Sequence, residues 1–241
     1  FAPSPSASVP MNSAARFTLD TPALAAEVQD FLDNPSNNFG WMIKAATEGV
    51  KTARGFAARE FSVIPQRPTL TIDYTLPPLP TFCDPANNNS SGAPAVLTGT
   101  FTGAPGTGLH LDVSGGPPPL TGGANIGYFL VGNMDASPGI VVSDGQFCLV
   151  GVPGASFGRY NVFGTNRNSI GLFDAAGNLE NFAGTGGPTN YGFDVPLEVE
   201  VAGFPLTTIM AGDTYHFQCW YRDSLAGAGH SNFSNGLSVT F

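Results

Sequence analysis

The stretch at residues 214–221, TYHFQCWY, decides the fold because its apolar and polar side chains alternate with a period of two. Successive side chains of a β-strand point to opposite faces of the sheet, so this alternation predicts a strand with one buried face. The predicted buried side chains are Tyr215, Phe217, Cys219 and Tyr221. The same period recurs at residues 109–113, 195–201 and 237–241, and turn sequences separate these runs. This pattern predicts an antiparallel β-sandwich, either immunoglobulin-like or jelly-roll-like.

The composition of the 241 residues agrees with many short strands joined by turns. Gly (31) and Pro (21) are frequent and only 11% of the residues are charged, where about a quarter is usual, which argues against a helical bundle. The net charge of −9 argues against nucleic-acid binding, because phosphate contacts need clustered Lys and Arg. No apolar run approaches the roughly 18 residues of a membrane helix, so we expect no membrane insertion.

The first part of the chain carries the one convincing helix signal. Thr21 fits an N-cap, and Pro22 fits the first helical position, where its missing N–H costs nothing. An apolar stripe follows through residue 32, and Asn34-Pro35 ends the helix because the residue before proline avoids the helical region. The fold class expected for the whole chain is therefore all-β with one short helix.

We expect three regions along the chain. Residues 1–76 form the first domain, with strands predicted from their alternation at residues 40–46, 56–61 and 69–74. The proline-rich residues 77–82 form a semi-rigid linker, and residues 83–241 form the antiparallel sandwich.

Three cysteines, Cys83, Cys148 and Cys219, allow one disulfide and one spare thiol. Cys219 lies on the predicted apolar face of its strand, so we expect a buried free thiol there. We therefore favour a Cys83–Cys148 disulfide, and pairings that involve Cys219 stay open as alternatives. Few lysines and many Asn, Ser, Thr and Gly residues are typical of an extracellular or cell-surface protein.

Three segments of the first domain resemble a known family: VQDFLDNPSNNFGWMIK (28–44), ARGFAARE (53–60) and RPTLTIDY (67–74). Together they resemble the C-terminal half of the DNRLRE (disaggregatase-related) jelly-roll family, some of whose relatives bind acidic polysaccharide. In that family several strands precede the helix, whereas about twenty residues precede it here. The resemblance implies that residues 1–76 form a partial, incomplete jelly roll.

The second domain resembles a C-terminal β-sandwich module of large secreted bacterial proteins. The resembling segments include GYFLVG (127–132), GQFCLVG (145–151), FQCWYRD (217–223) and SNFSNGLSVTF (231–241). This resemblance implies an extracellular location and a fold, and it carries no activity.

An incomplete first domain would leave apolar faces and strand edges uncovered, which predicts association with other copies of the chain. We expect an extracellular structural protein, the subunit of a filament that is held together by β-strand exchange between subunits. The extended, Pro/Ser-rich residues 1–9 are the expected assembly arm, with Phe1, Pro3 and Val9 lying on a neighbouring subunit.

A carbohydrate-binding module is the alternative function, with glycans as partners. Its expected ligand platform is formed by the aromatic residues Trp41, Tyr128 and Trp220. His216 and Gln218 share a strand face with Trp220, and a half-covered sheet face is the competing interpretation of that group. Three sequon asparagines, Asn88, Asn89 and Asn232, are candidate glycosylation sites.

Sequence motifs of common catalytic sites are absent: the chain has no GxSxG, HExxH, phosphate-binding loop or GxGxxG. Glu198 and Glu200 could form a carboxylate pair, but their spacing fits the solvated face of a strand better. The acidic residues Asp30, Asp33 and Glu60 match no calcium-loop spacing, and the scattered His and Cys residues fit no zinc site. We therefore expect no enzyme activity, no metal and no cofactor.

Overall fold

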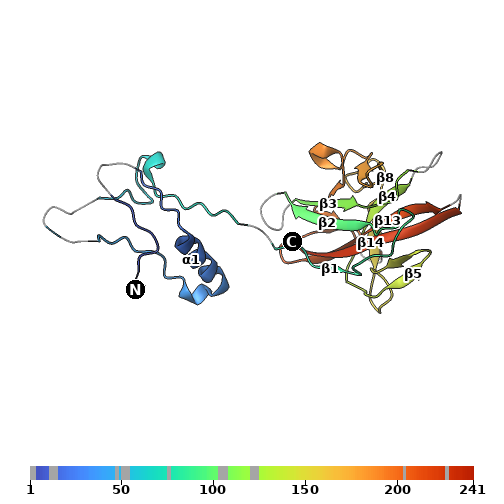
Figure 1. Ribbon diagram of the computed structural model, residues 1–241, viewed down its shortest axis with the longest axis horizontal. Coiled ribbons are helices and arrows are strands. Elements are labelled where there is room, and N and C mark those ends of the chain that lie inside the picture. The colour runs from blue at the N-terminus through green and yellow to red at the C-terminus, as the bar shows by residue number, and fades with distance from the viewer. Residues whose placement is uncertain are drawn as a thin grey trace. The chain divides into compact units, whose positions relative to one another are not determined.

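The structure is a computed structural model that describes residues 4–10, 16–46, 49, 55–74, 77–102, 108–119, 125–202, 205–225 and 228–241. The chain divides into two compact units, Phe1–Thr75 and Leu76–Phe241, here called the first and the second unit. The predicted fold class is confirmed: the protein is mostly β, with one short α-helix and several antiparallel sheets in a sandwich-like arrangement (Figure 1).

The first unit contains the predicted helix. Its described helical elements are α1 (Pro22–Asp33), η1 (Pro35–Asn37) and η2 (Ile64–Gln66). The Leu24 N–H donates to Thr21 Oγ1 at 3.3 Å, so Thr21 is the N-cap that the sequence predicts. The helix ends at Asn34, whose N–H donates to the Asp30 carbonyl just before Pro35.

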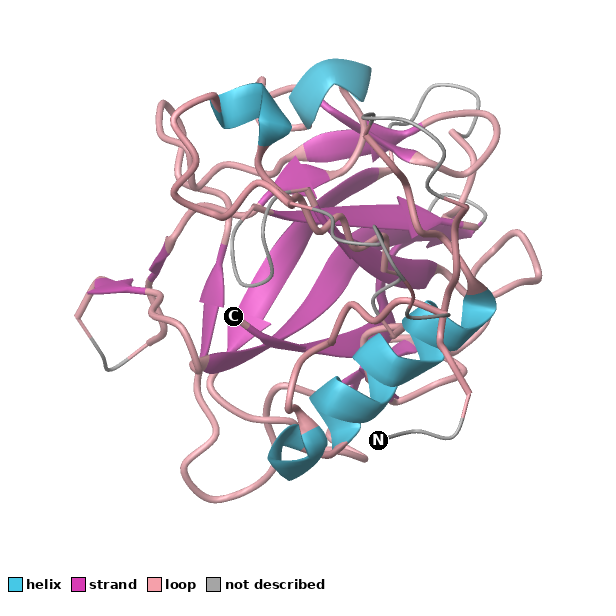
Figure 2. Cartoon of the chain, turned by 90° about the vertical axis from the view of Figure 1, so that its left-hand side faces the viewer, coloured by secondary structure: helices cyan, strands magenta, loops and turns pink. Residues whose placement is uncertain are grey.

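The three strands predicted in the first unit are wrong. Residues 40–46, 56–61 and 69–74 form no strand. Figure 1 draws no arrow among the described residues of this unit, and Figure 2 shows α1 as a long cyan helix. Alternation decides which side chains share a face, but a strand also needs a neighbouring chain that accepts its hydrogen bonds. None of the described residues of this unit is buried, so the expected partial jelly roll has neither a sheet nor a core there.

The described regular elements of the second unit are almost all strands, and most of them are short. They are β1 (Thr81–Phe82), β2 (Val96–Phe101), β3 (Leu109–Ser114), β4 (Ile126–Gly132), β5 (Ile140–Val142), β6 (Gly145–Phe147), β7 (Phe157–Arg159), β8 (Gly171–Phe173), β9 (Leu179–Asn181), β10 (Phe193–Asp194), β11 (Glu198–Val199), β12 (Thr207–Thr208), β13 (Thr214–Leu225) and β14 (Ala228–Thr240). A short helix, η3 (Gly187–Thr189), precedes β10.

Two boundaries differ from the sequence prediction. Thr81 and Phe82, expected in the linker, form β1 and pair with β14, so they belong to the sheet. The strand expected at residues 195–201 is reduced to β11, and the Leu197 side chain is exposed. Pro196 has no N–H to donate to a neighbouring strand, which interrupts pairing at this point.

The strands form one large and one small sheet that face each other. The large sheet has the order β1-β14-β13-β4-β8-β9, with β7 also paired to β4, and the small sheet has the order β10-β3-β2. The pairs β5-β6 and β11-β12 form two-stranded sheets of their own. Every strand pairing that the structure describes is antiparallel.

An apolar inner core joins the two sheets. From β13 it contains Phe217, Cys219 and Tyr221, which is the face that the alternation predicts, with Tyr215 partly buried beside it. Leu109, Leu111 and Val113 of β3 enter the same core from the small sheet. The ring of Phe193 on β10 stacks on Phe129 of β4, with 5.8 Å between ring centroids.

A second apolar group, the outer cluster, covers part of the other face of the large sheet. Its buried members are Phe82, Leu130, Phe147, Cys148, Leu149 and Phe233. The β5-β6 hairpin lies against β14 at this place, and Cys83 forms a disulfide with Cys148. The central strands are therefore buried on both faces, which period-two alternation does not reveal.

Candidate functional site

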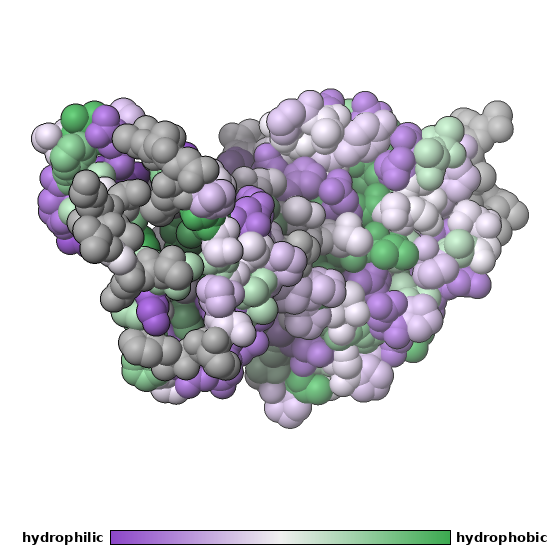
Figure 3. All heavy atoms as spheres, turned by 60° about the vertical axis from the view of Figure 1, so that its left-hand side comes forward, coloured by the Kyte–Doolittle hydropathy of each residue, from purple (hydrophilic) through white to green (hydrophobic). Residues whose placement is uncertain are grey.

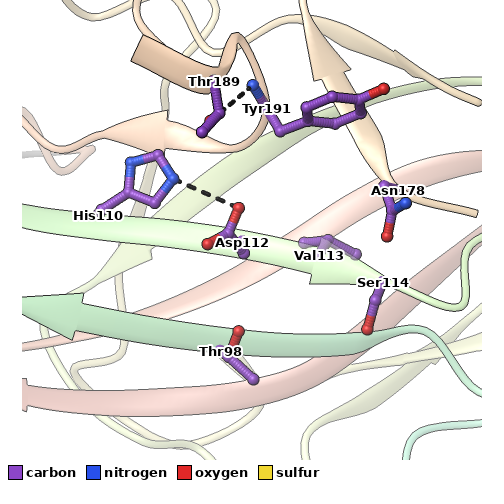
Figure 4. Close-up of a pocket in the computed structure, with 8 residues that line it drawn as sticks. All are labelled: Thr98, His110, Asp112, Val113, Ser114, Asn178, Thr189 and Tyr191. Carbon is purple, nitrogen blue, oxygen red and sulfur yellow. Dashed lines mark hydrogen bonds and ion pairs between the residues drawn. The ribbon is translucent and has the colours of Figure 1, made fainter. Parts of the chain in front are cut away.

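A polar cavity of about 390 Å³ lies on the outer face of the small sheet (Figure 4). Five of its lining residues come from β2 and β3: Thr98, His110, Asp112, Val113 and Ser114. Three come from the segments around β9 and η3: Asn178, Thr189 and Tyr191. The strand alternation that buries Leu109, Leu111 and Val113 places His110 and Asp112 on this outer face.

His110 is the charged centre of the cavity wall. Its Nδ1 lies 2.6 Å from Asp194 Oδ1, and its Nε2 lies 3.3 Å from Asp112 Oδ1. The β3-β10 register pairs His110 with Asp194. The hydrogen bond with Asp112, together with the one to Asp194, raises the pKa of His110 to about 9 against the opposing effect of burial. At neutral pH both ring N–H groups therefore donate to carboxylates.

Tyr191 approaches the cavity because the chain after it runs very close to β3. Gly192 has φ +66°, and a Cβ at this position would lie 2.2 Å from the Leu111 carbonyl oxygen. Only glycine tolerates both this positive φ and so close an approach of another backbone. The Tyr191 hydroxyl donates to Asp174 Oδ2 at 3.2 Å, and this bond raises the pKa of Tyr191 and fixes the direction of the ring.

We expect the stability of the second unit to fall as the pH rises from about 6.5 to about 9. The folded protein holds the His110 proton more tightly than the unfolded chain, whose histidine pKa is about 6.5. The two ion pairs therefore contribute fully below pH 6.5, and their contribution is lost as the pH passes the folded pKa. Because both aspartates are about half exposed, solvent screening limits the loss to about 1–2 kcal/mol.

Urea unfolding at pH 6 and pH 9.5 tests this dependence, with Trp41→Phe as the background so that Trp220 alone reports fluorescence. His110→Gln is the matched variant, because it keeps hydrogen-bonding capacity and removes the titrating group. Its free energy of unfolding should change less over this interval than that of the unsubstituted chain. Equal changes in the two proteins would contradict the assignment to His110.

The ligand platform predicted from the sequence is divided between the units. Trp41 belongs to the first unit, where its Nε1 donates to Glu27 Oε2 at 2.7 Å. Tyr128 and Trp220 are cross-strand neighbours in the second unit, with ring centroids 4.9 Å apart and planes tilted by 37°. Both rings are half-buried and they are not coplanar, so they do not form a flat stacking surface.

The polar face expected around Trp220 is also different from the prediction. Gln218 is fully buried, because the outer cluster covers that part of β13. Its side chain accepts from the Cys148 N–H and donates to the carbonyls of Gln146 and Ser234. Burial lowers the pKa of His216, which hydrogen-bonds Ser238 Oγ across the β13-β14 pair at 2.9 Å. These side chains form hydrogen bonds within the fold.

The three sequon asparagines have different surroundings. Asn232 is fully buried and its side-chain amide donates to the Asn88 carbonyl at 3.1 Å. Asn89 is also buried, and its amide donates to the Gly115 carbonyl at 2.7 Å. A glycan on either side chain would find no space in the folded protein, so the burial of Asn89 and Asn232 argues against these two candidate sites. Asn88 is exposed and stays a candidate.

The cysteines have the arrangement that the sequence analysis favours. Cys83 and Cys148 form the disulfide, across a sequence separation of 65 residues. Cys219 is a free thiol in the inner core, and burial raises its pKa. The thiolate is the reactive form of cysteine, so a buried thiol that stays protonated is unreactive.

An apolar groove of about 190 Å³ lies on the first unit. It is bounded by one polar residue, Asn38, and by six apolar ones, Val28, Phe31, Leu32, Trp41, Leu70 and Ile72. Apolar atoms reach the surface of this unit, which lies on the left of Figure 3. Val28, Phe31 and Leu32 belong to the apolar stripe predicted for the helix, which forms, whereas Trp41, Leu70 and Ile72 lie in predicted strands that do not form.

The expected assembly arm is only partly within the described residues. Phe1 and Pro3 lie outside them, and Val9 is half-buried in a segment without regular structure. The Ser6 carbonyl accepts from Thr21 Oγ1 at 2.6 Å, and the Ser6 hydroxyl donates to Glu27 of the same helix. Part of this segment therefore lies along α1 of its own chain.

The residues considered for catalysis or metal binding are dispersed or already paired. Glu200 forms an ion pair with Arg167, and Glu198 is exposed on β11. Asp30 and Asp33 accept hydrogen bonds from neighbouring side chains of α1 and η1. Within the described ranges, no three His, Cys, Asp or Glu side chains converge to hold a metal ion. Among the described helices, none has the length and apolar character needed to cross a bilayer.

In comparisons with protein-family models, with curated proteins and with solved structures, nothing matches this chain. The sequence analysis could have identified part of the polar cavity, since His110 and Asp112 alternate on the outer face of one predicted strand. It could not have identified Asp194 or Tyr191, because they reach the cavity only through the pairing of β10 with β3.

Proposed function

We propose that this chain is an extracellular structural protein whose first unit is completed by a β-strand from another copy of the chain. The observation that carries the proposal is the absence of any buried residue among residues 4–10, 16–46, 49 and 55–74. A unit that spans residues 1–75 and carries this many apolar side chains is expected to bury them, since each large one contributes about 1.5–3 kcal/mol. Phe39, for example, is 92% exposed.

The backbone of the first unit supports strand addition as the mode of association. Residues 42–46 and 68–74 have no regular secondary structure, and no backbone hydrogen bond joins either segment to another part of the described chain. A segment whose N–H and C=O groups are unpaired can form a ladder of hydrogen bonds with an incoming strand. Leu70, Ile72 and Tyr74 alternate along the second segment, which would set the register of that strand.

The groove beside residues 68–74 supports the same mode. It is lined by α1 on one side and by Leu70 and Ile72 on the other, so apolar side chains of the added strand can pack in it. We propose a second copy of the chain as the occupant. The chain itself contains segments in which apolar and polar side chains alternate, and a strand bound in this groove needs that pattern. The residues around Val9 are the candidate donor, and head-to-tail donation of this kind propagates a filament.

The Cys83–Cys148 disulfide supports an extracellular location, since disulfides persist in oxidising compartments. The proposal assigns no enzymatic activity to the chain. The secreted β-sandwich module that the second unit resembles agrees with a location outside the cell.

Sedimentation velocity over a range of concentrations tests the proposal. We expect the mass to rise from that of a 24.9 kDa monomer to multiples of it. Leu70→Asp should weaken association about 10- to 100-fold, because it removes one large apolar contact and introduces a charge. Leu206→Asp is the matched control, since Leu206 is similarly exposed but belongs to the second unit.

Two results would contradict this function. One is a chain that stays monomeric at every concentration. The other is association that Leu70→Asp and Leu206→Asp weaken equally, because the first unit would then have no special part in it. A chain that lacks residues 1–10 tests the donor separately: unchanged filament formation by that variant would exclude the arm.

A further inference from the structure

We propose that the polar cavity on β3 of the second unit binds a neutral, polyhydroxylated ring, such as one sugar unit of a glycan. This site is separate from the apolar groove and from the aromatic pair of Tyr128 and Trp220. Its lining residues all belong to the second unit, so it does not depend on the assembly proposed for the first.

The cavity differs from an ordinary solvated sheet face because a second layer of chain closes one side of it. The segment from η3 to Tyr191 rises over β3, and the tight approach at Gly192 holds it there. In Figure 4, Thr189 and Tyr191 face Asp112 and Val113 across the cavity. The volume of about 390 Å³ lies within the ~300–1,000 Å³ range of small-molecule sites.

The lining chemistry matches hydroxyl groups. Seven of the eight lining residues carry a polar side chain, and Val113 is the one apolar member. The Thr98 and Ser114 side chains are exposed at the cavity, so each hydroxyl is open to a ligand and can both donate and accept. Asp112 adds a carboxylate whose side chain is half exposed, which can accept from two neighbouring hydroxyls of a ring.

The charge of the cavity disfavours an anionic ligand. His110 is the one cationic side chain in the lining, and two aspartates already hold both of its ring nitrogens. An anionic ligand would therefore meet an excess of negative charge that also includes Asp174 behind Tyr191. A purely apolar ligand would leave the polar lining unpaired, at a cost for each group.

Tyr191 supplies an aromatic surface at the cavity wall. Its ring faces the space above β3, and the hydrogen bond from its hydroxyl to Asp174 fixes its orientation without using the ring face. A rigid aromatic surface beside hydroxyl and carboxylate groups can contact the C–H face of a sugar while the polar groups bind its edge. Asn178, next to this ring, adds an amide that both donates and accepts.

Titration of the ¹⁵N-labelled full chain with a panel of neutral oligosaccharides of glucose, galactose, mannose and xylose tests the proposal by NMR. We expect at least one of them to bind with a Kd of about 1 mM or tighter. Its largest shift changes should be at the backbone amides of Asp112, Ser114 and Tyr191. Tyr191→Ala should weaken binding about tenfold, whereas Tyr191→Phe, which keeps the ring, should stay within about threefold.

Two threonines of β2 provide a matched pair of variants. Thr98→Val removes a hydroxyl from the cavity and should weaken binding about threefold or more. Thr100→Val makes the same change on the same exposed face, outside the lining, and should leave binding unchanged. Unchanged thermal unfolding of all variants shows that they remain folded.

Three outcomes would overturn the proposal. The first is no binding of any neutral oligosaccharide at millimolar concentration. The second is a set of shift changes centred on Trp220 or Trp41 instead of the cavity. The third is binding of the cationic probe spermidine at the cavity while the neutral sugars cause no change. Assembly in sedimentation experiments is a separate readout, so failure of either proposal is distinguishable from failure of the other.

Discussion

Replacing both Cys83 and Cys148 by serine should lower the free energy of unfolding of the second unit by about 4 kcal/mol. The disulfide closes a loop with a sequence separation of 65 residues, and the loop-entropy relation gives a loss of that size. The closed loop contains β2, β3 and β4, which contribute to both sheets. Without the disulfide, these segments gain conformational freedom in the unfolded chain. A domain of this size has a total stability of about 5–15 kcal/mol, so the expected loss is a large part of it.

Urea unfolding with Trp220 fluorescence in a Trp41→Phe background measures this change. Reductant is the internal control: it should lower the stability of the disulfide-bonded chain to that of the double serine variant and leave the variant itself unaffected. Cys219 is unchanged in both proteins and buried in both. A loss of less than about 1 kcal/mol would contradict the prediction, because it would place the substitutions among ordinary surface changes.

Phe193→Ala should destabilise the second unit by about 3–5 kcal/mol, the range for truncating a buried aromatic residue. Phe193 is fully buried, and its ring stacks on Phe129 across the two sheets. The ring of Tyr160 packs against it on another side, with 4.8 Å between centroids. Since these neighbours belong to packed strands and turns, they cannot move in to fill the space that the alanine leaves.

Phe163→Ala is the matched control, since Phe163 is 79% exposed and the same atoms are removed. Its free energy of unfolding should stay within about 0.5 kcal/mol of that of the unsubstituted chain. Equal effects of the two substitutions would show that Phe193 does not join the sheets. Because Phe193 immediately precedes Asp194, its variant should also lower the pKa of His110, which NMR titration can follow.

The two units of the chain differ in how far their apolar side chains are buried and their polar groups are paired. The second unit has its own core, its own disulfide and a satisfied buried polar network around Gln218. The first unit has apolar side chains at its surface and, among its described residues, segments without backbone hydrogen-bond partners. The assembly proposed for the first unit and the ligand site proposed for the second therefore rest on independent observations and independent experiments.

The sequence by itself determined the features that depend on neighbouring residues. Thr21, Pro22 and the Asn34-Pro35 pair set both ends of α1, because capping and proline geometry act within a few residues. Period-two alternation placed Phe217 and Cys219 of β13 and Leu111 of β3 in the core, because a strand turns successive side chains to opposite faces.

Only the tertiary structure decided the features that depend on distant partners. Residues 69–74 alternate as well as β3 does, but they form no strand, because no other described segment pairs with them. Gln218 and Asn232 are polar and yet fully buried, because the outer cluster and the residues around Asn88 cover them. The polar cavity joins β3 to Asp194, 84 residues after His110, through the register of two strands. Local patterns fix which way a side chain points, and only the fold decides what it meets there.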